Sequence, residues 1–77
     1  MEIKILGTGC TRCKALERLT REVVAQNKID ATIIKVEDIV EILNYGIIST
    51  PAIVVNGKVV FKGRIPSTDE LTKALTS

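Results

Sequence analysis

Cys10 and Cys13 are the residues of this chain whose type and spacing are best suited to chemistry. They are the only cysteines among its 77 residues, and two residues separate them in the stretch ILGTGCTRCKALERL, residues 5–19. A Cys-x-x-Cys pair is compatible with a structural disulfide, with part of a metal site or with a redox-active dithiol. The spacing alone is compatible with all three kinds of site. The predicted strand and helix around the two cysteines help to distinguish them.

The pair lies between a predicted strand and a predicted helix. Residues 2–6, EIKIL, alternate in polarity and are rich in β-branched side chains, which predicts a strand. After Thr11, apolar residues recur at helical intervals and predict an amphipathic helix to about Asn27. These residues are Leu16, Leu19, Val23 and Val24. Cys10 then falls at or next to the N-cap, and Cys13 falls in the first helical turn.

A helix start is a good place for a reactive thiol. Residues three apart on a helix have Cβ atoms about 5–6 Å apart, which is close to disulfide geometry. The unpaired N–H groups and the positive end of the helix dipole stabilise a thiolate, and Arg12 and Lys14 add positive charge. We therefore expect the pKa of Cys10 to lie below the value of about 8.5 for a free cysteine. Cys10 is predicted to be the nucleophile and Cys13 the resolving thiol.

The rest of the chain predicts a compact alternation of strands and helices. Residues 31–36 read as a strand, and a short helix from 37–38 would bury Ile39, Val40 and Leu43 and end at Gly46. Residues 52–55 and 58–61 flank Asn-Gly, the pattern of a hairpin with a type I′ turn.

A capping box marks the start of the last helix. Ser67 and Glu70 have the spacing at which each side chain bonds the other's backbone N–H. The helix that follows would bury Leu71, Ala74 and Leu75. The predicted order is thus β-α-β-α-β-β-α, an α/β fold with a four-stranded mixed sheet, parallel first strands and helices on both faces. At this length, we expect a single domain over residues 1–77.

Composition narrows the possible functions. Eleven basic and nine acidic residues give a net charge of +2, too balanced for a nucleic-acid footprint, so we expect no nucleic-acid partner. No apolar run approaches the roughly 20 residues of a membrane span, and the N-terminus has no signal-peptide core, so no membrane partner and a cytoplasmic location are expected. In a reducing compartment, such a pair is more often catalytic or metal-binding than structural. A bridge this local would also constrain little of the unfolded chain.

Three features together resemble the thioredoxin/glutaredoxin-like superfamily, and most closely its small single-domain redox-active disulfide proteins. They are GTGCTRCK after the first strand, STPAIVVNGKVVFKG in the second half, and the short capped C-terminal helix. The resemblance implies a thioredoxin-like three-layer fold and a thiol–disulfide oxidoreductase or redox carrier. It implies no cofactor beyond a reversible Cys10–Cys13 disulfide.

The resemblance also assigns the remaining site residues and partners. Pro51, preceded by Thr50, matches the proline that is cis in that superfamily, faces the cysteines and helps dock substrate. Thr11, Arg12 and Lys14 would tune the thiolate. The implied partners are a disulfide-containing protein substrate and an upstream reductase, with glutathione as a further possibility from Gly63-Arg64 and the following acidic residue. The chain is expected to act as a monomer.

The chain also departs from that pattern. It has no tryptophan, and the first strand offers Lys4 where thioredoxins keep a buried carboxylate. A soft-metal (Cu or Zn) carrier using the same two thiols is the alternative. Against it, Thr8 stands where such carriers usually have methionine, and the chain ends in a helix.

Overall fold

The protein follows the predicted order of elements in a computed structural model that describes residues 1–9 and 11–76. The prediction of seven elements is confirmed, and their boundaries differ from it by one or two residues. The bounds are β1 (Glu2–Leu6), α1 (Thr11–Gln26), β2 (Thr32–Val36), α2 (Ile39–Asn44), β3 (Ala52–Val55), β4 (Lys58–Lys62) and α3 (Thr68–Thr76).

The strands form one mixed sheet in the order β2-β1-β3-β4. β1 pairs in parallel with β2, whereas the β1–β3 and β3–β4 pairs are antiparallel. The parallel pair is connected through α1, because a crossover between parallel strands needs a helix-sized connection. The predicted four-stranded mixed sheet is therefore confirmed.

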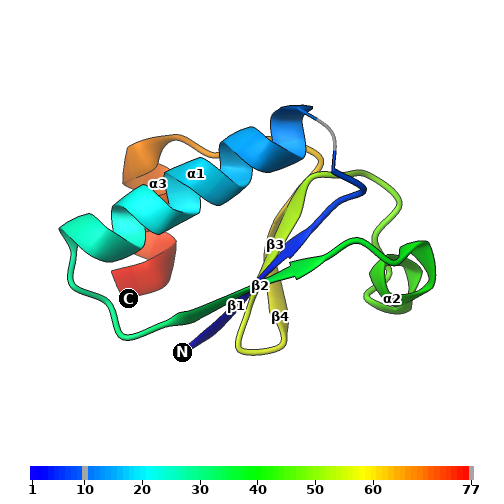
Figure 1. Ribbon diagram of the computed structural model, residues 1–77. Coiled ribbons are helices and arrows are strands. Elements are labelled where there is room, and N and C mark those ends of the chain that lie inside the picture. The colour runs from blue at the N-terminus through cyan, green and yellow to red at the C-terminus, as the bar shows by residue number, and fades with distance from the viewer. Residues whose placement is uncertain (10, 77) are drawn as a thin grey trace.

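The three helices lie on the two faces of this sheet (Figure 1). α1 and α3 contact each other and pack on one face, and α2 lies on the other. Alternating side chains of β1 serve both layers: Ile3 and Ile5 face α1 and α3, while Leu6 joins Ile42 of α2. The fully buried residues of both clusters are aliphatic.

Local signals fix two of the connections. Asn56 and Gly57 have φ values of 50° and 84°, as the predicted type I′ turn requires. Ser67 Oγ accepts a hydrogen bond from Glu70 N at 3.1 Å, and Glu70 Oε1 accepts one from Ser67 N at 3.0 Å. The capping box is thus formed on both sides, and Leu71 and Leu75 behind it are buried.

The prediction of which α2 residues face the core is wrong. Ile39, Val40 and Leu43 are 57%, 60% and 53% exposed, and Ile42 is the buried residue of the helix. The helix begins at Ile39 after Asp38, whose Oδ1 accepts a hydrogen bond from Val40 N at 2.9 Å. Because α2 has six residues, fewer than two helical turns, only a narrow stripe of its surface can contact the sheet. Ile42 lies on that stripe.

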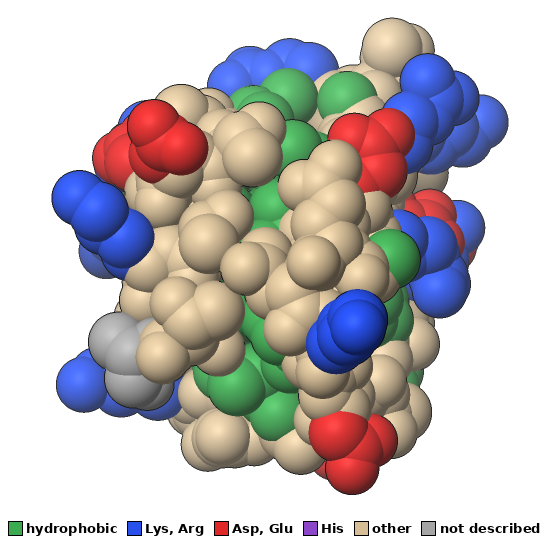
Figure 2. Space-filling model, turned by 90° about the vertical axis from the view of Figure 1, so that its left-hand side faces the viewer, with side chains coloured by type: hydrophobic (Ala, Val, Ile, Leu, Met, Phe, Trp, Pro, Cys, Tyr) green, Lys and Arg blue, Asp and Glu red, His purple; other side chains and the backbone are tan. Residues whose placement is uncertain are grey.

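Charged side chains of both signs lie around the surface. Figure 2 shows one side of the molecule, where hydrophobic side chains form a narrow strip between polar and charged ones. Within the described ranges, no helix is long and apolar enough to cross a membrane.

Candidate active site

All four strands contribute to one end of the sheet, and the start of α1 lies there too. Val36 at the end of β2 pairs with Leu6 at the end of β1, Leu6 with Ala52 at the start of β3, and Ala52 with Lys62 at the end of β4. Just beyond the end of the β1–β2 pair, Gly7 N donates a hydrogen bond to Val36 O at 3.0 Å. Every predicted site residue belongs to one of two chain segments next to these strand ends. One follows β1 and runs into the start of α1, and the other directly precedes β3.

Cys13 is buried in the first turn of α1, with 6% of its surface exposed. Its sulfur lies directly against Gly7, so that a β-carbon at position 7 would overlap Cys13 Sγ. Glycine at the end of β1 therefore makes the space in which this thiol sits. Cys10, the predicted nucleophile, lies outside the described residues.

The three residues predicted to tune the thiolate are exposed at the start of α1. Arg12 reaches across to the end of β4, where one of its Nη atoms donates to Gly63 O at 3.4 Å. Thr11 and Lys14 flank it in sequence. Since α1 has no acidic residue in its first turn, positive charge dominates this helix start.

The Thr50–Pro51 peptide bond is cis. Pro51 is buried and Thr50 half-buried, and Pro51 O accepts a hydrogen bond from Gly63 N at 2.9 Å. Among the described residues, the Thr50 N–H and C=O have no backbone hydrogen-bond partner. Just upstream, Ile47 is buried and Ile48 is 92% exposed.

Lys4 is separated from this site by the sheet. Its Nζ donates to the Tyr45 hydroxyl at 2.9 Å on the α2 side and lies 5.5 Å from the centre of that ring. The hydrogen bond with Tyr45 raises the pKa of Lys4 above its ordinary value. Lys4 thus stands at a position of β1 whose side chain faces α2, and Tyr45 is half-buried with its hydroxyl bonded to Lys4.

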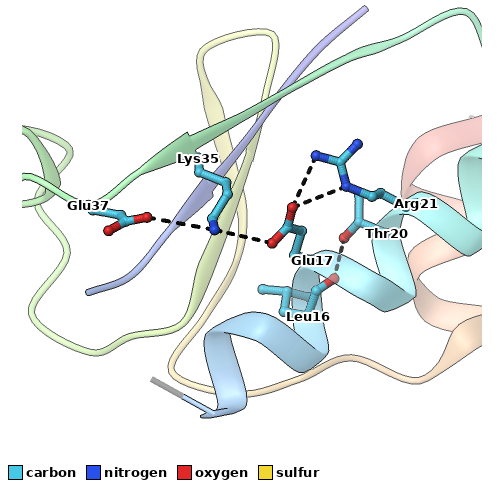
Figure 3. Close-up of polar contacts among 6 residues, drawn as sticks. All are labelled: Leu16, Glu17, Thr20, Arg21, Lys35 and Glu37. Carbon is cyan, nitrogen blue, oxygen red and sulfur yellow. Dashed lines mark hydrogen bonds and ion pairs between the residues drawn. The ribbon is translucent and has the colours of Figure 1, made fainter. Parts of the chain in front are cut away.

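The carboxylate that approaches the cysteine segment is Glu37, after β2. Its Oε2 lies 4.0 Å from the position that a β-carbon at Gly9 would take. Lys35 lies between Glu37 and Glu17 of α1, at 3.7 Å and 3.5 Å, as Figure 3 shows. Arg21 donates to Glu17 at 3.1 Å, and this bond, followed by Lys35, lowers the pKa of Glu17.

A second ion pair holds the loop between β4 and α3. Arg64 donates two parallel hydrogen bonds to Glu70, at 3.0 Å and 2.8 Å, and its guanidinium lies over the Phe61 ring. Together with the Ser67 backbone, Arg64 lowers the pKa of Glu70 from 4.5 to about 2. Arg64 is thus engaged within the chain.

Comparison with known proteins decides the family. The family model described as a thioredoxin domain matches residues 1–76. The chain belongs to the thioredoxin family. Two similar proteins are both named Thioredoxin. The one from Methanothermobacter thermautotrophicus is 38% identical over 76 residues, 99% of each chain. The one from Methanocaldococcus jannaschii is 37% identical over 75 residues, 97% of this chain and 86% of the relative.

Membership of the thioredoxin family confirms the predicted superfamily and supports a thiol–disulfide redox function. Thioredoxins work through their own cysteine thiols and need no cofactor. Nothing in the match supports the soft-metal alternative. Within residues 1–9 and 11–76, no three or more residues of the types His, Cys, Asp and Glu are grouped so that they could hold a metal ion.

Sequence reasoning missed three features of this thioredoxin-family site. They are the role of Gly7 against Cys13, the approach of Glu37 to Gly9, and the packing of Gly63 beside Pro51. Gly7 carried a usable signal, because a glycine that ends a strand just before Cys-x-x-Cys suggests close approach of another group. Nothing in the sequence indicated that Glu37 would approach Gly9 or that Gly63 would pack beside Pro51, since both contacts depend on strand pairing.

Proposed function

We propose that this protein is a protein-disulfide oxidoreductase or redox carrier that uses Cys10 as nucleophile and Cys13 as resolving thiol. The observation that carries the proposal is the position of Cys13, buried in the first turn of α1 against Gly7 and at the end of the sheet where Thr50–Pro51 lies. A buried second thiol suits the resolving step, which is internal to the protein. The chain position of Cys10, just before Thr11 and the N–H groups of α1, suits a thiolate.

The reaction conserves atoms and electrons in two exchanges. The Cys10 thiolate attacks one sulfur of the partner's disulfide, and the other sulfur leaves as a thiolate that takes up a proton. The Cys13 thiol then loses its proton and attacks Cys10 in the mixed disulfide, releasing the second partner thiol. The partner gains two electrons, and this protein is left with a Cys10–Cys13 disulfide that an upstream reductase converts back to the dithiol.

The structure suggests how a substrate segment would be held. The Thr50 N–H and C=O, which lack backbone partners among the described residues, can pair with an extended segment beside the cysteines. Thr50 and Pro51 would thus dock the substrate, while Thr11, Arg12 and Lys14 would favour the thiolate through the positive charge of this helix start.

A redox titration tests this proposal. The purified protein is equilibrated in glutathione or dithiothreitol buffers, its thiols are counted, and its metal content is measured in parallel. We expect one two-electron couple between roughly −120 and −300 mV. Stoichiometric copper or zinc without a reversible disulfide would instead favour the soft-metal carrier.

Two variants test the division of roles. Cys10→Ser should abolish disulfide reduction, because no nucleophile remains. Cys13→Ser should accumulate mixed disulfides with substrate, because the resolving step is lost; mass spectrometry detects these adducts. The opposite pattern would reverse the assignment of the two thiols.

The oligomeric state, the location and the partners of the protein are part of the same proposal. We propose that the chain acts as a monomeric single domain over residues 1–77 in the cytoplasm, with a disulfide-containing protein as substrate. Glutathione is a second possible thiol partner, and glutathione adducts on Cys10 in the titration above would support it.

A further inference from the structure

We infer that a basic, apolar-edged groove beside Pro51 selects disulfide substrates whose extended segment carries an apolar and an acidic side chain. The groove is lined by Gly46, Ile48, Ser49, Lys62 and Gly63, and we call it the 48/62 groove. The inference rests on the proposed function and specifies its substrate class.

The 48/62 groove adjoins the candidate active site through backbone contacts. Gly63 N bonds Pro51 O at 2.9 Å, and a β-carbon at Gly63 would lie 3.1 Å from that of Ser49. These contacts hold the end of β4 against the segment that leads into β3. A segment paired with Thr50 would therefore lie beside the groove.

Ile48 gives the groove an apolar edge. It is 92% exposed, more than any other large hydrophobic side chain in the described part of the chain, although its neighbour Ile47 is buried. Covering such a side chain with an apolar group of a partner removes both from water, which favours binding. Ile48 stands three residues before Pro51 in the chain, so this contact would form beside the segment that we propose docks the substrate.

The charge of the groove is positive. Lys62 is the one charged residue among its lining residues, and Arg12 reaches the same rim through its bond to Gly63 O. Neither forms an ion pair with a carboxylate of residues 1–9 or 11–76. Arg64 nearby is already neutralised by Glu70. An acidic side chain would therefore find unneutralised cations here, and a basic one would be repelled.

Short peptides test the inference. Each carries one cysteine as a mixed disulfide with 5-thio-2-nitrobenzoate, next to Leu and Glu, Leu and Lys, or Ser and Glu. The reduced protein releases the coloured thiolate and the free peptide thiol, and it becomes the Cys10–Cys13 disulfide. Rates are divided by those with dithiothreitol, which removes the intrinsic reactivity of each peptide. We expect the Leu/Glu peptide to react about threefold or more faster than either other peptide.

Paired variants locate the effect. Lys62→Glu should abolish the preference for Glu over Lys, whereas Lys58→Glu, with the same charge change at the far end of β4, should keep it. Ile48→Ser should abolish the preference for Leu over Ser, whereas Ile39→Ser, also exposed, should keep it. High salt should weaken the first preference and leave the second.

A neutral disulfide, 4,4′-dithiodipyridine, separates the two ways of failing. If the wild type reduces it but treats the three peptides alike, or if the control variants lose the preferences equally, the groove inference is wrong. If the wild type fails to reduce it with formation of the Cys10–Cys13 disulfide, the proposed function is wrong.

Discussion

At the scale of single residues, the missing side chain of Gly7 leaves the space that the Cys13 sulfur occupies in the first turn of α1. The backbone of Gly7 lies outside the left-handed region, so alanine is tolerated conformationally and only the space is lacking. Position 7 is therefore constrained by the sulfur and not by the turn.

Gly7→Ala should destabilise the reduced protein by about 1–3 kcal/mol, because an overpacked core must shift to admit a methyl group. Denaturant unfolding measures the change, and Thr8→Ala at the exposed neighbouring position is the control. In a Cys13→Ala background the cost should shrink, since the sulfur that causes the overlap is gone. An equal cost in both backgrounds would show that the contact is not responsible.

At the scale of elements, α2 is held to the sheet by one side chain. Ile42 is fully buried in the cluster that contains Leu6 and Val54, while Ile39 is exposed. Periodicity within a helix of six residues cannot distinguish these two positions.

Ile42→Ala should therefore cost about 2–5 kcal/mol of unfolding free energy, from lost burial and the cavity left behind. Ile39→Ala should change it by no more than about 0.5 kcal/mol. Chemical denaturation of both variants provides the comparison. Equal losses would mean that the helix is packed through the face that the sequence predicted.

The capping box of α3 is also an ion-pair site, and it should make stability depend on pH. The pKa of Glu70 is lowered from 4.5 to about 2 in the folded state, so its stabilising contribution is present above pH 4.5 and is lost as the pH falls toward 2. Glu70→Gln should lower the Tm at pH 7, and the difference from wild type should vanish at the acidic end of that window. Asp69→Asn, one residue earlier in the same turn, should show a smaller effect; an equal effect would implicate general helix-dipole charge.

At the scale of the whole molecule, charged side chains connect α1 to β2 near the end of the sheet where the candidate active site lies. Lys35 of β2 bridges Glu17 of α1 and Glu37 in the loop after β2, and only the fold brings Glu17 close to the other two (Figure 3). The pKa of Glu17 is lowered by Arg21 first and by Lys35 second, so this contribution is present above its ordinary pKa and is lost as the pH falls.

Lys35→Met should lower the Tm modestly at low salt, with a difference that shrinks at high salt, because exposed pairs are weak and screened. It should also raise the pKa of Glu17 toward its ordinary value, which NMR titration can follow. Lys58→Met removes a lysine that has no ion pair within the described residues and serves as the control. A Tm difference that is insensitive to salt would mean that the aliphatic part of Lys35 matters instead.

The amino-acid sequence by itself determined the features that depend on near neighbours in the chain. The order of elements, the Asn56-Gly57 turn, the Ser67–Glu70 cap and the helix that starts just after Cys10 follow from local spacing and backbone preference. These interactions span a few residues, so their partners are readable in order. The cysteine pair was recognisable for the same reason, whereas the role of Thr50-Pro51 was expected only from the resemblance to the thioredoxin/glutaredoxin-like superfamily.

The tertiary structure alone decided which distant groups meet. Strand register places Gly63 beside Pro51 and Lys62 beside the Ile48 segment, and helix packing places the Cys13 sulfur against Gly7. The side of the sheet that each residue of β1 faces likewise places the Lys4 side chain beside Tyr45, on the face that α2 covers. Such contacts depend on side-chain direction and register between strands far apart in sequence, and a one-residue shift in either would change every partner.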